Sequence, residues 1–336
     1  MASNATGALK ALTLMDIMAF KDPNGQIAKI TELLTQNNIF MRHLLFKEGN
    51  SEDGHIIARR VSLGKPTWTG YNEGPEPSVS RVTQVTETCG HLADFIQVDK
   101  RLAERSGNVG EFMLLQSKGK MEAMSQEMAR TFIYGNQMAN RRSFTGLIPR
   151  LSKLNTKRFT DNPIVLDAGG SSSGNLASIL LVGWGDSTVY GIYPKHSKAG
   201  MQYEFYGDKV LLKDKNGREY PGYKAYFEWT AGLCVEDPRC VVRIANIDTT
   251  DLSYDEAKAK ELFNLVIEAQ SYIPEGVSLK MYAPREVWTY VSKQAAANVN
   301  RNVTANVKDA RLVSDVNGIP FFRTDAMLPT EVKVTA

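Results

Sequence analysis

The sequence predicts an α+β fold, and three features of the chain carry this prediction. Residues Gly54 to Asp99 read as an extended, β-rich segment that glycines and prolines interrupt. A long helix is expected from Val109 to Tyr134, where apolar residues recur at helical spacing. From Ile164 onward the chain turns β-rich again, with continuous apolar runs typical of buried strands.

The extended segment predicts a projecting two-stranded arm without a core of its own. Strand-forming residues before Leu63 and after Val79 flank a stretch rich in glycine and proline. An isolated hairpin is only marginally stable in water and needs a surface to pack against. Trp68 and Tyr71 lie near the expected tip, and exposed aromatic side chains between glycines and prolines are typical docking residues. We therefore expect the arm to pack on another copy of the protein.

Three basic doublets allow two readings. Arg59-Arg60, Arg141-Arg142 and Lys157-Arg158 are charged pairs of the kind that water commonly solvates on a surface. The alternative is an ion-pair contact with a neighbouring subunit, since the planar guanidinium group binds a carboxylate through two hydrogen bonds.

One face of the long helix carries mostly methionine. Met121, Met124, Met128 and Phe132 share this face at helical spacing. We expect this stripe to lie in the core, where flexible methionine side chains tolerate irregular packing.

Further elements follow from local signals. The segment 1–46 reads as an arm with a short helix from Leu9 to Phe20 and a turn at Asp22–Gly25. Asn216-Gly217 predicts a hairpin with a type I′ turn. Ser253 and Glu256 match a capping box at the start of a helix whose apolar face holds Leu262, Leu265, Val266 and Ala269. The Asn- and Ala-rich stretch from Ala295 to Val307 predicts a surface loop.

Composition excludes several classes of protein. A length of 336 residues predicts about two domains with a sizeable core. Lys and Arg number 40 against 37 for Asp and Glu, which argues against a dedicated polyanion binder. The three cysteines make no disulfide framework and fit a reducing compartment. We expect neither a signal peptide nor a membrane span, because no apolar run reaches about 18 residues.

Candidate catalytic chemistry is weak. Gly170–Gly174 matches G-x-S-x-G with Ser172 as nucleophile, but a strand-like run follows where a nucleophile elbow needs a helix. His196 is the one later histidine, and no convincing acid accompanies it. The histidines His43, His55, His91 and His196 are too scattered to predict a metal site. We expect no catalytic, metal or cofactor site, and a serine hydrolase stays as the distant alternative.

Several short blocks of the chain together form a pattern. The blocks are Asp22–Ile30, Val85–Gly90, Val98–Lys100, Glu122–Met124, Glu127–Ala129, Tyr134–Asn136, Phe144–Leu147, Asp167–Gly170, Gly191–Lys195, Lys198–Gly200, Val241–Ile247 and Asn317–Pro320. In these blocks the chain resembles the major capsid proteins of tailed bacteriophages, particularly short-tailed ones. No block is diagnostic alone, but their order and their spread over nearly the whole chain make the resemblance specific.

The resemblance implies the Hong Kong 97-like capsid fold. It implies an N-terminal arm at 1–46, an extended β-hairpin loop at 47–98 and a peripheral domain with a spine helix at 99–160. It further implies a mainly axial domain at 161–310 and C-terminal strands at 311–336 that return to the peripheral domain. Some relatives link subunits through Lys–Asn bonds, and Lys65 lies in the corresponding loop, but its sequence surroundings lack the acidic and apolar residues such chemistry needs.

The implied function is structural. Copies would form hexamers and pentamers of an icosahedral shell that encloses double-stranded phage DNA without binding it specifically. The expected partners are a separate scaffolding protein, a portal protein and, in some relatives, a decoration protein, with no membrane. The shell would assemble in the cytoplasm of a bacterial host and persist as the virion capsid. Residues Arg59, Arg60, Lys65, Trp68 and Tyr71 are the expected subunit contacts. The main alternative is an encapsulin-like compartment with the same fold and a protein cargo.

Overall fold

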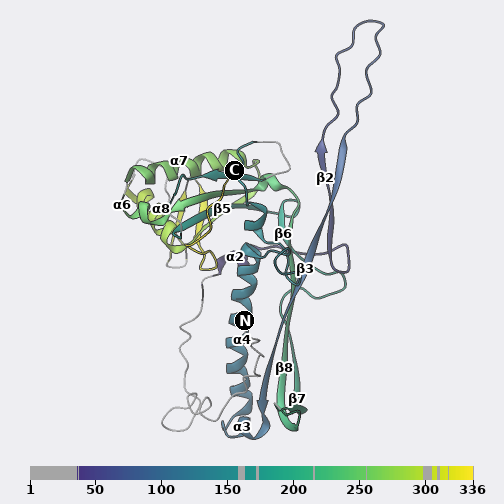
Figure 1. Ribbon diagram of the computed structural model, residues 1–336, viewed down its shortest axis with the longest axis vertical. Coiled ribbons are helices and arrows are strands. Elements are labelled where there is room, and N and C mark those ends of the chain that lie inside the picture. The colour runs from purple at the N-terminus through teal and green to yellow at the C-terminus, as the bar shows by residue number, and fades with distance from the viewer. Residues whose placement is uncertain are drawn as a thin grey trace, which may run out of the picture. The chain divides into compact units, whose positions relative to one another are not determined.

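The computed structural model of the protein confirms the α+β fold (Figure 1). It describes residues 36, 38–157, 163–171, 174–214, 216–254, 256–297, 305–308, 311–316 and 318–335. The helix and turn expected before residue 35 lie outside this range. Among the described residues, one compact unit holds 91–127 and 200–230, and a second holds 36–90, 128–199 and 231–335. We call them unit 1 and unit 2. In the described part of the chain, no helix is both long and apolar enough to cross a bilayer.

Unit 1 forms where strands and a helix cover each other's apolar faces. It comprises the last part of β3 (Arg81–Asp99), α3 (Lys100–Glu104), most of α4 (Val109–Tyr134), β7 (Gln202–Lys213) and most of β8 (Glu219–Val235). Alternate residues of β3 and β8 point toward α4, so Ile96, Val98 and Phe227 pack with Phe112 and Met124 in one cluster. The expectation that the whole segment to Asp99 lacks a core is therefore wrong for residues 91–99.

The long helix α4 has the bounds that the sequence predicts. At its start, the Asn108 side chain accepts a hydrogen bond from the Glu111 backbone amide at 3.2 Å. The predicted stripe is buried at Met124, Met128 and Phe132 but not at Met121, which is 46% exposed. In unit 1 the buried face contains Phe112, and nine residues at 3.6 per turn place Met121 on the opposite side of the helix. The buried face thus rotates along the helix.

The β7–β8 hairpin is confirmed, but its turn is not type I′. Gly217 has a φ of 79°, whereas Asn216 is not among the described residues with positive φ. The Asp214 carboxylate instead accepts hydrogen bonds from the amides of Asn216 and Arg218, each at 2.8 Å. This side-chain contact holds a longer turn than Asn-Gly alone predicts.

Unit 2 is built on a mixed sheet. Its hydrogen-bonded path runs β11 (Ala305–Lys308), β12 (Arg311–Val316), β13 (Ile319–Arg323), β10 (Ser278–Ala283), β5 (Leu176–Trp184), β6 (Val189–Tyr193) and the end of β8. β9 (Val241–Asp248) lies antiparallel to β5, and β4 (Ile164–Asp167) lies parallel to β9. β1 (Phe46–Glu48) pairs in parallel with β6. Every residue of β5 and β9 is buried. The largely apolar sequence of β5 predicts this burial, whereas β9 also buries Arg243, Asn246 and Asp248.

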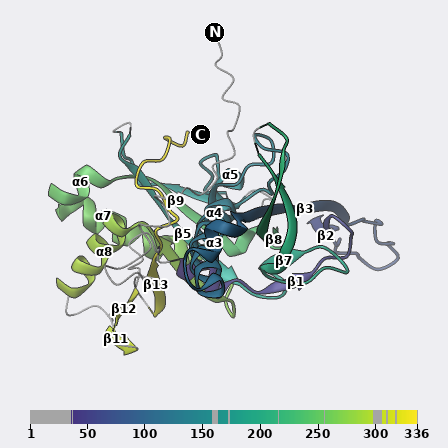
Figure 2. The ribbon, with the colours of Figure 1, turned by 90° about the horizontal axis from the view of Figure 1, so that it is seen from below.

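Three helices cover one face of this sheet (Figure 2). They are α6 (Thr249–Tyr254), α7 (Glu256–Tyr272) and α8 (Arg285–Ala297). The predicted face of α7 is confirmed, because Leu262, Val266 and Ala269 are buried and Leu265 packs against the same core. The side chains of the capping box at Ser253 and Glu256 lie outside the described set. The expected loop at Ala295–Val307 is wrong at both ends, where residues 295–297 end α8 and residues 305–307 lie in β11.

A buried polar cluster fixes the C-terminal residues of unit 2. Arg243 on β9 pairs with Glu331 at 2.8 Å and donates to the Leu151 carbonyl at 2.7 Å. Tyr134, at the end of α4, donates to the other Glu331 oxygen at 2.6 Å. Burial and the neighbouring Glu331 carboxylate raise the pKa of Tyr134 well above its usual range. The hydroxyl therefore stays protonated and keeps donating at neutral pH.

The short helices α2 (Ile39–His43) and α5 (Leu147–Arg150) lie against the same unit. Phe40 meets Trp184 and Tyr282 edge-on, with ring centroids 5.2 Å apart in both pairs. His43 hydrogen-bonds the Tyr282 hydroxyl at 2.7 Å, and burial lowers its pKa to about 4. His43 is therefore a neutral structural side chain at physiological pH.

Met121 and Met124, two of the methionines of α4, give a matched test of the observed burial. We expect Met124→Ala to lower the free energy of unfolding by about 2–5 kcal/mol, because it leaves a cavity in the apolar core of unit 1. Met121→Ala should change it by less than about 0.5 kcal/mol, because the side chain is half exposed. Urea unfolding of the unassembled subunit, followed by far-UV circular dichroism, measures both. Equal losses for the two variants would contradict the rotation of the buried face.

Candidate assembly arm and its anchor

The predicted arm is a β-hairpin of unit 2. We define the arm as residues 54–90, which are β2 (Gly54–Ser62), the connecting loop 63–80 and the first half of β3. The strands pair antiparallel from Gly54↔Thr88 to Ser62↔Arg81, with one irregularity after Arg60. The pairing ends at Ser62↔Arg81 and does not continue into the loop 63–80. This loop contains prolines, which have no amide hydrogen to donate. Figure 1 shows the loop running on past the ends of both strands.

Exposure of apolar side chains increases toward the end of the arm. Ile57, near the base, is buried against Tyr190, Ile192 and Cys234. Trp68 and Tyr71 in the loop are fully exposed, and Leu63 and Val79 are 75% and 80% exposed. Exposed large apolar side chains that gather in one region often mark an interaction site. The outer half of the arm is therefore a candidate contact surface.

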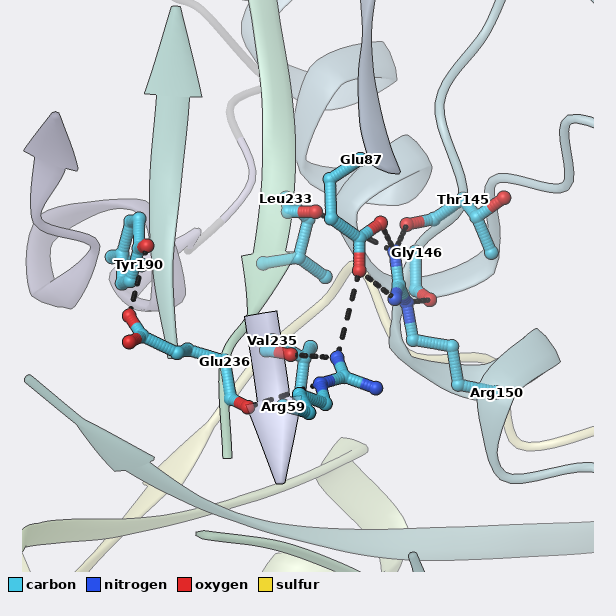
Figure 3. A network of polar contacts seen from close by, with 9 residues as sticks. All are labelled: Arg59, Glu87, Thr145, Gly146, Arg150, Tyr190, Leu233, Val235 and Glu236. Carbon is cyan, nitrogen blue, oxygen red and sulfur yellow. Dashed lines mark hydrogen bonds and ion pairs between the residues drawn. The ribbon is translucent and has the colours of Figure 1, made fainter. Parts of the chain in front are cut away.

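A buried carboxylate connects the arm to the rest of unit 2 (Figure 3). The Glu87 side chain on β3 is only 7% exposed, and both of its oxygens accept from Arg150 on α5 at 2.6 Å. This is the bidentate geometry in which arginine and carboxylate bind most strongly. Arg150 also donates to the carbonyls of Gly146 and Thr145 at 3.1 and 3.0 Å, so its guanidinium group is held in place.

The other strand of the arm, β2, contributes to the same cluster. Arg59 on β2 reaches within 3.9 Å of Glu87 and donates to the backbone carbonyls of Val235 and Glu236. The Glu236 side chain in turn accepts from the Tyr190 hydroxyl at 3.0 Å. Figure 3 shows the guanidinium groups of Arg59 and Arg150 converging on Glu87 from two elements. We call Arg59, Glu87 and Arg150 the arm anchor.

The predicted contact residues therefore fall into two sets. Arg59 lies in the arm anchor, inside the chain, whereas Arg60, Lys65, Trp68 and Tyr71 are exposed. Sequence reasoning missed Glu87 and Arg150. Glu87 could have been noticed, because it is a charged residue on the inward side of a strand rich in Val and Thr. A buried charge of this kind needs a partner. Nothing local indicated Arg150 as that partner.

The three cysteines do not have the properties of reactive thiols. All three cysteines are free, and burial raises the pKa of Cys89 and Cys240 to about 12 and that of Cys234 to about 11. A thiol is a poor nucleophile when its pKa is this high. The Ser172 side chain lies outside the described residues, but the strand β5, rather than a helix, follows Gly174. That order does not make a nucleophile elbow.

Cavities open on unit 2, and two of them are lined by described residues. The larger, of about 490 Å³, is lined by Asp167, Gly169, Asp248, Lys258 and Glu261 among others. The smaller, of about 230 Å³, lies beside the arm anchor. Within the described residues, no three His, Cys, Asp or Glu side chains are grouped closely enough to hold a metal ion.

Comparison with solved structures defines the class of protein. A chain in the near-atomic-resolution structure of bacteriophage Epsilon15 shares 29% identity, with 99% of this chain and all of that chain covered and a TM-score of 0.73. Two further solved structures are less similar, with TM-scores of 0.40 for the first and 0.38 for the second. The capsid of an empty GTA particle shares 12% identity over 71% of this chain and 99% of that chain. The holo-SrpI encapsulin complex from Synechococcus elongatus shares 11% over 66% and 93%.

The fold is thus that of a coat protein of a bacterial virus. A family model described as Major capsid protein GP7 matches residues 22–335, and the chain belongs to this family. Members are structural proteins of the phage capsid, which confirms the predicted family and, at this level, the predicted function. A search of curated proteins found no match.

The arm anchor predicts a specific loss of stability. Replacing Arg150 with methionine leaves the buried Glu87 carboxylate without its bidentate partner, so we expect about 3–5 kcal/mol of destabilisation. The control is Arg130→Met on the exposed side of α4, which should stay within about 0.5 kcal/mol. Urea unfolding of the unassembled subunit measures both variants. If Arg150→Met behaves like Arg130→Met, the anchor does not hold the arm.

Proposed function

We propose that copies of this protein form hexamers and pentamers that tile an icosahedral shell around double-stranded phage DNA. The observation that best supports this proposal is the structure of the arm. Its base is held by the hydrogen bonds between Arg150 and Glu87, and Trp68 and Tyr71 in its outer half are fully exposed. An arm of this kind gains stability only when a second molecule covers it. Membership in a family of phage major capsid proteins supports a second copy of the same chain as that molecule.

The arm makes a head-to-tail contact in this proposal. Each subunit places its arm on one neighbour and receives the arm of another, and a contact of this type closes into a ring when the rotation fits. Burial of a large apolar side chain is worth about 1.5–3 kcal/mol, so each contact is modest. Repetition around a closed shell makes the sum large. In this arrangement Arg60, Lys65, Trp68 and Tyr71 contact the neighbour, and Arg59 holds the arm at its base.

The two units correspond, in this proposal, to the two domains of the capsid fold. We assign unit 1, which contains most of α4, to the peripheral domain of the capsid fold, and the mixed sheet of unit 2 to the axial domain. This assignment puts residues 200–230 in the peripheral domain, whereas the sequence predicts a mainly axial segment at 161–310. The boundaries at 1–46, 47–98, 99–160, 161–310 and 311–336 stay predictions. The near balance of 40 basic and 37 acidic residues suits a shell that holds DNA at high density without binding it tightly.

Further partners belong to the same proposal. Assembly of a closed shell of defined size calls for a separate scaffolding protein, and DNA entry calls for a portal protein at one vertex. A decoration protein on the outside is compatible with this scheme. Assembly would take place in the cytoplasm of the bacterial host.

A single aromatic side chain tests the arm contact. We expect Trp68→Ala to leave the subunit folded, because Trp68 is fully exposed, and to reduce the yield of assembled particles at least about tenfold, as loss of an interface hot spot does. The measurement is sedimentation and negative-stain microscopy of the full chain produced with a scaffolding protein. Circular dichroism checks the fold.

The matched control is Thr69→Ala, which alters an exposed neighbour on the same loop and should assemble normally. Normal assembly of Trp68→Ala would refute the arm contact. A wild-type chain that stays monomeric with its scaffolding protein would refute the shell itself. Particles that protect DNA from nuclease support a genome container, whereas particles filled with protein would favour an encapsulin-like compartment.

A further inference from the structure

A second exposed surface of unit 2 has the properties of a rigid docking site. We call residues 136–143, between α4 and α5, the Met138 loop. The Asn136 carbonyl accepts from the amides of Ala139 and Asn140 at 3.1 and 2.9 Å, and its side chain accepts from Met138 at 2.9 Å. Asn140 repeats the pattern with Arg142 and Ser143 at 3.1 and 3.0 Å. Two consecutive side-chain-capped turns fix the loop without using its outer side chains.

The outer side chains of this loop are turned to solvent. Met138 is 94% exposed, and Arg141 and Arg142 are exposed beside it. Among the described residues, neither arginine forms an ion pair, in contrast to Arg150 and Arg243, which bind buried carboxylates. A rigid loop that presents a methionine and two guanidinium groups has little conformational entropy to lose on binding.

The loop of the arm carries the complementary groups. Glu73 and Glu76 are exposed near Trp68 and Tyr71, and neither glutamate forms an ion pair within the described chain. The Glu73 carboxylate accepts from the Gly70 amide at 3.2 Å, which places the charge beside the backbone between Trp68 and Tyr71. Methionine sulfur packs favourably against aromatic rings, and guanidinium groups bind carboxylates through two hydrogen bonds.

We propose that the Met138 loop of one copy receives the arm loop of a second copy. Met138 packs against Trp68 and Tyr71, while Arg141 and Arg142 pair with Glu73 and Glu76. This inference rests on the proposed head-to-tail assembly and adds the receiving surface to it. It also gives the Arg141-Arg142 doublet the subunit-contact role that was one of its two readings from sequence.

Charge reversal on each side, alone and combined, tests the pairing. The variants are Arg141→Glu with Arg142→Glu, Glu73→Arg with Glu76→Arg, and all four together, each in the full chain produced with its scaffolding protein. Either reversal alone should reduce the yield of assembled particles at least about tenfold, because repulsion replaces attraction at every copy of the contact. The combined variant should recover to within about threefold of the wild type, since the ion pairs return with opposite sign.

The control reverses another exposed basic pair, Lys195→Glu with Lys198→Glu, and should assemble like the wild type. All variants should keep the melting temperature of the wild-type subunit, because the altered side chains are exposed. If the wild type assembles and the combined variant does not recover, or if the control loses as much yield, the pairing is wrong while the shell stands. If the wild type fails to assemble, both proposals fall together.

Discussion

The arm depends on one buried carboxylate. Glu87 lies almost out of water, and the guanidinium groups of Arg150 and Arg59 compensate its charge from α5 and β2. A buried charge of this kind is costly without its partners, so it tolerates few alternative positions of the strands that carry it. The hairpin has little apolar core toward its tip, and its direction is therefore set at the base. An exposed arm can reach a defined point on another molecule only if its base is fixed.

The same principle explains how polar and apolar contacts are divided in unit 2. Buried polar contacts join elements within the unit. Examples are the Arg243–Glu331 ion pair and the hydrogen bonds that Tyr282 forms with Trp184 and His43. Where contact with another copy is proposed, charged groups that water solvates well lie beside exposed aromatic and methionine side chains, and burying such apolar side chains is worth about 1.5–3 kcal/mol each. In the proposed assembly, the exposed side chains of the arm supply the contact with a neighbouring copy, and the buried pairs keep the base of the arm fixed.

Local sequence patterns were sufficient for the long elements. α4 has the predicted bounds, and β5 is a buried strand in the region predicted to be β-rich, because helical periodicity or a largely apolar run continues over many residues. The patterns failed where a distant contact decided the outcome. Met121 matches the stripe, yet the sheet of unit 1 covers the face with Phe112. The turn at Gly217 follows the Asp214 carboxylate rather than the Asn-Gly pair, and the stretch after Ala295 is partly helix and strand.

The sequence by itself determined the α+β class, the arm with its exposed Trp68 and Tyr71, and the family. These properties lie in continuous stretches of the chain, where composition and spacing are visible directly. Only the tertiary structure decided which charges are internal. Arg59 and Arg60 are neighbours in sequence, yet one joins a buried cluster and the other faces solvent. Strand alternation turns adjacent side chains to opposite faces, and Glu87 and Arg150 meet across 63 residues of chain. Such a partner is fixed by folding in three dimensions, and no local pattern contains it.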